Sequence, residues 1–115
     1  MGLRSRRKGQ RGEREAAEAL AAIGVAARRT GQTCGTDAPD VETALPGVHV
    51  EVKRCERLNL SQALGQATRD AGPCRTPIVV HRANGKPWMV TLRLSDLPRL
   101  ARAVVEALAA IVPPL

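Results

Sequence analysis

The chain has 115 residues, 43% of them apolar, which suits one globular domain with one packed core. It contains no Phe, no Tyr and a single Trp, so aliphatic side chains must fill that core. The formal net charge is +7, a balance that favours association with polyanions. The three cysteines form no C-x-x-C pair and are odd in number, which argues against a zinc site or a disulfide framework.

Basic residues are concentrated at the start of the chain. Six Lys or Arg residues fall within the first 14 positions, against Glu13 alone of opposite sign. Such a run is typical of a solvated segment that lies along phosphates. We therefore expect residues 1–11 to form a flexible basic arm. Its candidate nucleic-acid contacts are Arg4, Arg6, Arg7, Lys8 and Arg11.

Hydrophobic periodicity predicts a helix and three strands in the first half of the chain. Ala16, Leu20 and Ile23 recur at helical spacing, and Gly24 ends that run. Valine-rich alternation on either side of Pro46-Gly47 indicates two strands joined by a turn. The expected bounds are 12–24 for the helix and 25–30, 40–45 and 48–54 for the strands.

The second half of the chain continues with a helix, two strands and a final helix. The expected bounds are 59–71 for the helix, 77–82 and 87–94 for the strands, and 95–111 for the last helix, with Ser95 as a candidate N-cap. The order α-β-β-β-α-β-β-α predicts an α/β fold in which helices flank a mixed central sheet. We expect residues 12–115 to form one domain.

The segment 48–54 alternates strictly between apolar and polar residues. Its valines point one way, into a core, while His49, Glu51 and Lys53 point the other way. Taken alone, such a strand is more typical of a solvated edge than of a site, and His49 is expected to be a surface residue.

The preceding strand favours a metal site. A two-residue turn at Pro46-Gly47 places Asp40 opposite Lys53 and Glu42 opposite Glu51 on one face. Like charges directly opposite each other destabilise a sheet, and a divalent cation would offset that repulsion. Mg²⁺ prefers hard oxygen ligands, which Asp40 and Glu51 supply. Glu42 is the main rival to Asp40, and Asp37 in the loop is a weaker one.

The first helix contributes another acid. Glu13 lies on the same helical stripe as Ala17 and Leu20, which pack on the sheet, whereas Glu15 and Glu18 point outward. A carboxylate on a packed face is costly unless it meets a cation or a donor. Glu13 is therefore the better candidate ligand, and Glu15 the surface acid.

These residues resemble a known pattern. Pro39-Asp40 followed by Glu51-Val52-Lys53 resembles the motif of the PD-(D/E)xK nuclease superfamily, which has a restriction-endonuclease-like fold. The segment Lys8-Gly9-Gln10-Arg11-Gly12-Glu13-Arg14-Glu15 resembles the opening of archaeal-type Holliday junction resolvases, which have phage-encoded relatives of similar size. The resemblance covers roughly residues 6–72, and the segment from Pro73 onward does not align with it clearly.

The resemblance implies roles for particular residues. Glu13, Asp40, Glu51 and Lys53 match the catalytic positions of the family, and Thr30 is the counterpart of its small hydroxyl residue, with a DNA-binding role. Asp40 and Glu51 would bind the metal directly, with the Val52 carbonyl as a third ligand. Glu13 would hold water or a second ion. Lys53 would orient or deprotonate the attacking water, or stabilise the phosphate. Gln66 and Gln62, on the second predicted helix, are weaker candidates for residues that assist the site.

The activity that follows is Mg²⁺-dependent DNA hydrolysis, with Mn²⁺ as a substitute. The expected substrate is a four-way DNA junction cut symmetrically by a homodimer. Another PD-(D/E)xK nuclease, of nicking, repair or restriction type, is the alternative. A non-catalytic DNA-binding module would leave the carboxylates unexplained, because acids repel phosphate. Neither a signal peptide nor a membrane span is recognisable, so we expect a cytoplasmic protein of a bacterium or archaeon, or a phage product made there.

Overall fold

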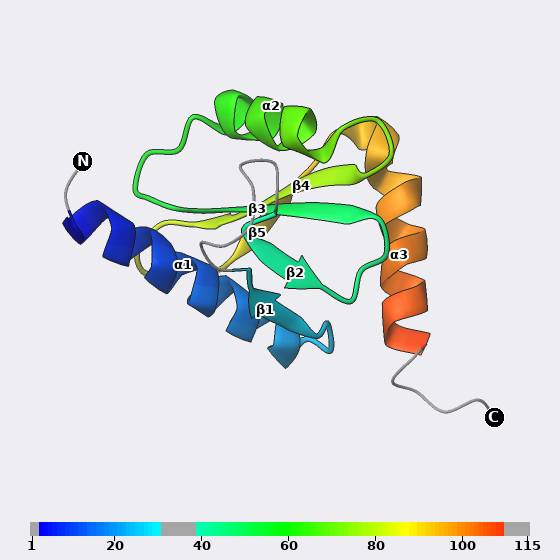
Figure 1. The fold of residues 1–115 in the computed structure, drawn as a ribbon, viewed down its shortest axis with the longest axis horizontal. Coiled ribbons are helices and arrows are strands. Elements are labelled where there is room, and N and C mark those ends of the chain that lie inside the picture. The colour runs from blue at the N-terminus through cyan, green and yellow to red at the C-terminus, as the bar shows by residue number, and fades with distance from the viewer. Residues whose placement is uncertain (1–2, 31–38, 110–115) are drawn as a thin grey trace.

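The computed structural model describes residues 3–30 and 39–109, with side chains from residue 9 onward. Its helices and strands follow the predicted order (Figure 1). Their bounds are α1 Leu3–Ala22, β1 Ala27–Arg29, β2 Val41–Thr43, β3 Val48–Arg54, α2 Leu60–Ala71, β4 Thr76–Arg82, β5 Met89–Thr91 and α3 Leu97–Ala109, with a short 3-10 turn at Leu94–Asp96 before α3.

The strands form one mixed sheet in the order β1-β2-β3-β4-β5. β3 and β4 are parallel, and the other neighbouring pairs are antiparallel. The predicted mixed sheet flanked by helices is therefore confirmed. β4 reads as a nearly continuous apolar run and is buried along most of its length, as expected for a strand covered on both faces.

Helices cover both faces of the sheet, as Figure 1 shows. On one face, α1 and α3 bury Leu20, Ala103 and Ala107 against Val50 and other residues of the sheet. On the other face, α2 buries a smaller cluster that contains Ala63, Ala67 and Val79. α2 begins after Asn59, whose side chain accepts a hydrogen bond from the backbone N–H of Gln62 at 3.1 Å. Because Val50 and Val52 of β3 pack in the cluster under α1 and α3, the polar face of β3 points toward α2.

The first helix is longer than the sequence predicted. α1 begins at Leu3, so residues 3–11 are helical and do not form an arm that precedes a helix at residue 12. The segment has no proline and is rich in Arg and Lys, which favour helix. Gly9 and Gly12 lower helix propensity without ending the helix, and Gly12 lets α1 approach β3, where an added Cβ would lie 3.0 Å from the Cβ of Arg54. The separation of residues 1–11 from the domain stays a prediction.

The β2–β3 hairpin has a different register from the predicted one. Val41 pairs with Val50, so Asp40 lies beside Glu51 and Glu42 beside His49. The connection spans residues 44–47, not only Pro46-Gly47. Leu45 is buried in the core, which draws the loop inward, and Gly47 adopts a positive φ of 68°. Packing of Leu45, which a turn motif does not reveal, thus set the register.

The last helix also begins differently. The 3-10 turn contains Ser95, and α3 starts at Leu97, so Ser95 does not cap it as predicted. Pro98 suits the first turn of α3 because its missing N–H is not needed there. The predicted end at Ile111 lies outside the described residues. In the described part of the chain, none of the helices combines the length and apolarity needed to cross a bilayer.

Candidate active site

Asp40 and Glu51 meet at the centre of the site. Asp40 directly precedes β2, and Glu51 occupies the middle of β3, where it is 3% exposed. The Asp40 Oδ2 atom accepts a hydrogen bond from the backbone N–H of Val52 at 2.9 Å. The register of the hairpin places this carboxyl group beside that of Glu51. Both predicted metal ligands are therefore brought together, in a register different from the expected one.

The surroundings of the two carboxyl groups shift their pKa values in opposite directions. Burial raises the pKa of Asp40 to about 7, the charges of Glu51 and Glu13 add to that effect, and the Val52 N–H partly opposes it. Burial alone would also raise the pKa of Glu51, but interactions with His49 and Asp40 outweigh it and the pKa is lowered. Of the two acids, Asp40 is therefore the one whose protonated form the fold favours.

Glu13 reaches the site from α1. Its charge is close enough to raise the pKa of Asp40, as the match to the nuclease pattern implied. Its Oε2 atom also accepts from Nε of Arg29 on β1 at 2.9 Å. Thr30 lies beside the same strand end, because its backbone N–H donates to the carbonyl of Asp40 at 3.2 Å. A DNA-binding role for Thr30 stays a prediction.

Lys53 extends the site along β3. It lies two residues beyond Glu51 on the same face, and its charge helps to lower the pKa of Glu51. Its Nζ atom donates to Oε1 of Gln66 on α2 at 3.3 Å. The sequence offered Gln66 as a weaker candidate near the site, and the structure joins it to Lys53.

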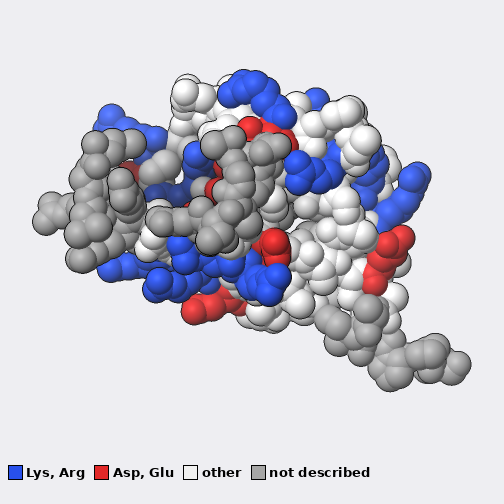
Figure 2. Space-filling view, viewed as in Figure 1, with Lys and Arg blue, Asp and Glu red and all other residues white. Residues whose placement is uncertain are grey.

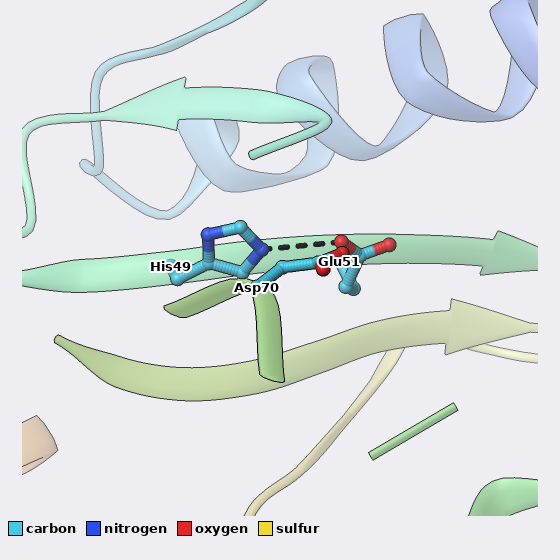
Figure 3. Close-up of side chains that lie close together, drawn as sticks. All are labelled: His49, Glu51 and Asp70. Carbon is cyan, nitrogen blue, oxygen red and sulfur yellow. Dashed lines mark hydrogen bonds and ion pairs between the residues drawn. The ribbon is translucent and has the colours of Figure 1, made fainter. Parts of the chain in front are cut away.

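His49 is buried, contrary to the expected surface position. Its side chain is fully buried, and Nε2 lies 3.1 Å from Oε1 of Glu51. Asp70 of α2 approaches the same place, so that ligand atoms of His49, Glu51 and Asp70 lie within 4.8 Å of one another. Figure 3 shows the three side chains meeting where α2 covers β3. Sequence reasoning missed Asp70, although it lies three residues after the buried Ala67 and hence near that face of α2.

Two other acids differ from their predicted places. Glu42, the main rival to Asp40, pairs with Arg28 at 2.8 Å on an exposed part of the sheet and does not join the site. Glu15 does not point freely into solvent, because its Oε2 accepts from Nε of Arg54 at 2.7 Å and its side chain is 29% exposed. The long Arg54 side chain reaches across to α1, which a helical wheel cannot reveal. Asp37, the weaker rival, lies outside the described residues.

The donor set fits a hard divalent cation. Asp40 and Glu51 offer carboxylate oxygens in a place where burial, and to a smaller extent the charge of Glu51, raises the pKa of Asp40. A bound cation would offset both effects and favour the ionised carboxylates. The Val52 carbonyl and Glu13 remain further candidate ligands. Glu51 also belongs to the group with His49 and Asp70, which adds an imidazole donor behind the carboxylate pair.

A basic surface accompanies this acidic site. Figure 2 shows Lys and Arg side chains gathered on the face where α1 lies, with few acidic ones among them. Arg11 and Arg14 are exposed on α1. The side chains of the other predicted arm contacts, Arg4, Arg6, Arg7 and Lys8, lie outside the described ones. The site thus combines buried acids with a surface that attracts polyanions.

The chain was compared with protein-family models, curated proteins and solved structures, and only the solved structures gave a match. No protein-family model matches the chain, and no curated protein matches its sequence. Among solved structures, it resembles Hjc of Archaeoglobus fulgidus, a Holliday junction resolvase from an archaeal hyperthermophile, with a TM-score of 0.51 over 71% of this chain and 73% of that chain. The two chains share a fold. Their sequences are 22% identical, so this likeness confirms the predicted restriction-endonuclease-like architecture.

Proposed function

We propose that this protein is a metal-dependent DNA endonuclease that resolves four-way junctions. The observation that carries the proposal is the partly buried Asp40 beside the buried Glu51, with Lys53 next to them on β3, in the fold of a junction resolvase. Buried acids in a basic protein are unfavourable for DNA binding alone, because they repel phosphate. Their presence favours a metal-dependent reaction on a phosphodiester.

Each residue of the candidate active site has a role in the proposed reaction. Asp40 and Glu51 would hold Mg²⁺, or Mn²⁺ in its place, with the Val52 carbonyl and Glu13 as further ligands. The bound ion would supply charge stabilisation to the phosphate and activate water for in-line attack. Lys53, held by its hydrogen bond to Gln66, would place its Nζ toward the phosphate and orient the attacking water or stabilise the developing charge. The basic residues of α1 would hold the DNA backbone.

Two coordinated cuts distinguish a resolvase from other nucleases of this fold. A homodimer would place one site on each of two strands related by a twofold axis.

The test compares a synthetic four-way junction with a linear duplex of the same sequence, each with and without Mg²⁺. We expect symmetric cuts in the junction only when the metal is present. Asp40→Asn should abolish cleavage yet preserve junction binding, since it removes a ligand and a charge that repels phosphate. Glu42→Gln is the matched control and should cut normally.

Each other outcome has a clear meaning. Equal cutting of the linear duplex would support the alternative, a nicking, repair or restriction-type nuclease on the same site. Junction binding without cleavage at any metal concentration would support a non-catalytic binding module. Cleavage by Asp40→Asn near the wild-type rate would overturn the site assignment.

A further inference from the structure

A hollow of about 340 Å³ adjoins the proposed active site at the start of α2. Its polar lining is Lys53, Arg57, Asn59, Gln62 and Gln66, and two apolar side chains complete the wall. Lys53 therefore belongs both to the carboxylate site and to this hollow. The sequence had singled out Gln62 and Gln66 without assigning them a function.

The groups that this hollow offers to a ligand are hydrogen-bond donors. The Oε1 atom of Gln66 already accepts from Lys53, and the Oδ1 atom of Asn59 already accepts from the backbone of Gln62. Their amide N–H groups remain, together with the guanidinium of Arg57 and the amide of Gln62. Among the residues that the structure describes, those lining the hollow include no carboxylate and no aromatic ring.

This chemistry selects a phosphate over a base. A phosphodiester is an anion whose exposed oxygens only accept hydrogen bonds, so it complements Arg and amide N–H groups. A nucleobase carries donors as well and is commonly bound by aromatic stacking, which these residues do not supply.

We propose that the hollow binds a second phosphate of the substrate strand, next to the one that faces Lys53. Arg57 and Gln62 are its principal ligands. The inference rests on the proposed function for the position of the DNA strand. It goes beyond that function because it assigns a binding role to the start of α2, outside the carboxylate site, and fixes the path of the strand as it leaves the site.

The experiment measures junction binding without divalent metal, so that cleavage plays no part in the result. Arg57→Ala is compared with Arg102→Ala, which removes the same charge from an exposed position on α3, and with Gln62→Ala. We expect Arg57→Ala to weaken binding about tenfold, as for loss of a hydrogen bond to a charged group, and Arg102→Ala to change it little. Arg57 is exposed, and thermal unfolding should confirm that both variants remain folded.

A set of junctions, each with a single neutral methylphosphonate linkage near the branch point, identifies the phosphate. At one linkage, neutralisation should weaken wild-type binding and have no further effect on Arg57→Ala, because both changes remove the same interaction. Two results would overturn the proposal. One is that a neutral linkage weakens binding as much in Arg57→Ala as in wild type at every position tested. The other is that Arg57→Ala and Arg102→Ala lose the same affinity. If Arg57 and one linkage show this coupling but the junction is not cleaved in Mg²⁺, the nuclease function is rejected and the phosphate-binding site is still supported.

Discussion

At the scale of single residues, the raised pKa of Asp40 is the main electrostatic feature of the metal-free site. The pKa of Asp40 is about 7 in the fold, mainly because of burial, against a usual value of 3.8. A raised pKa means that the fold favours the protonated acid. The stability that this proton provides is complete below about pH 4 and is lost as the pH rises through about 7.

Asp40→Asn should therefore stabilise the metal-free protein at high pH. The amide cannot ionise, and its oxygen can still accept from Val52. We expect the free energy of unfolding at about pH 8 to rise by about 1–3 kcal/mol relative to wild type, since one pKa unit corresponds to about 1.4 kcal/mol and solvent reduces the full effect. Urea denaturation at about pH 8 and about pH 4 tests this. If the variant and wild type differed in free energy of unfolding by the same amount at both pH values, the prediction would be contradicted.

Glu13→Gln should reduce catalysis far more than Glu15→Gln. The two variants are matched, because each loses one arginine ion pair, of 2.9 Å for Glu13 and 2.7 Å for Glu15, at similar exposure of 24% and 29%. Such partly exposed pairs contribute about 1 kcal/mol or less, so both proteins should remain folded. The charge of Glu13, however, acts on Asp40. Single-turnover junction cleavage would measure the difference, and a dead Glu15→Gln enzyme would show that the alignment is displaced by two residues.

His49 should orient the Glu51 carboxylate through the 3.1 Å contact at its Nε2 atom. His49→Leu removes the donor with little change in size, and we expect the affinity for Mg²⁺ to fall by about tenfold, as for other groups that orient metal ligands. His49→Gln keeps an N–H group near that place and should restore much of the affinity. Calorimetric titration of the DNA-free protein measures both, and unchanged affinity in His49→Leu would reject the role.

At the scale of secondary-structure elements, α1 combines packing with charge. Ala16, Ala17 and Leu20 anchor it on the sheet, while Arg11 and Arg14 remain exposed. Because residues 3–11 continue the same helix, their basic residues are carried on a regular element. A helix can present them to DNA phosphates with less loss of conformational entropy than a free arm.

Removal of residues 1–11 should weaken junction binding and reduce its dependence on salt. Each DNA phosphate that the shortened protein no longer neutralises lowers the slope of log affinity against log salt by about 0.9. Ala16, Ala17 and Leu20, which pack on the sheet, lie beyond the deletion, so the domain should still fold. Replacing Arg4, Arg6, Arg7 and Lys8 with Gln keeps the helix length and provides the control. A salt slope equal to that of wild type in both variants would show that this segment does not bind DNA.

At the scale of the whole molecule, α3 and β5 leave apolar side chains in solvent. Ala103 and Ala107 of α3 are buried, but Val105 is 66% and Leu94 is 83% exposed, and Met89 and Val90 of β5 are also exposed. Three exposed apolar residues on one helix, Leu97, Val105 and Leu108, are typical of an interaction surface.

The protein should therefore sediment as a homodimer at about micromolar concentration, with or without DNA. Val105→Glu introduces a charge on this surface and should favour the monomer. Glu18→Lys, which reverses an exposed charge on α1, provides the control. A wild-type monomer under both conditions would count against paired cutting of junctions, though not against hydrolysis of a single strand.

Much of the architecture could be predicted from the sequence, because local patterns follow the period of each element. The alternation of Val48, Val50 and Val52 indicated the strand and its two faces, and the spacing of Ala16, Leu20 and their neighbours indicated the helix. The motif residues Glu51 and Lys53 lie two positions apart on one strand of regular geometry. Their proximity therefore depends mainly on local structure, which is encoded in adjacent residues.

Interactions between distant segments were decided only by the tertiary structure. Burial of Leu45 set the register of the hairpin and brought Asp40 beside Glu51. Packing of α2 on the polar face of β3 buried His49 and added Asp70 to the site. Arg54 drew Glu15 out of solvent from 39 residues away. These features depend on shape and side-chain reach across the fold, and no periodic pattern along one segment records what another segment places against it.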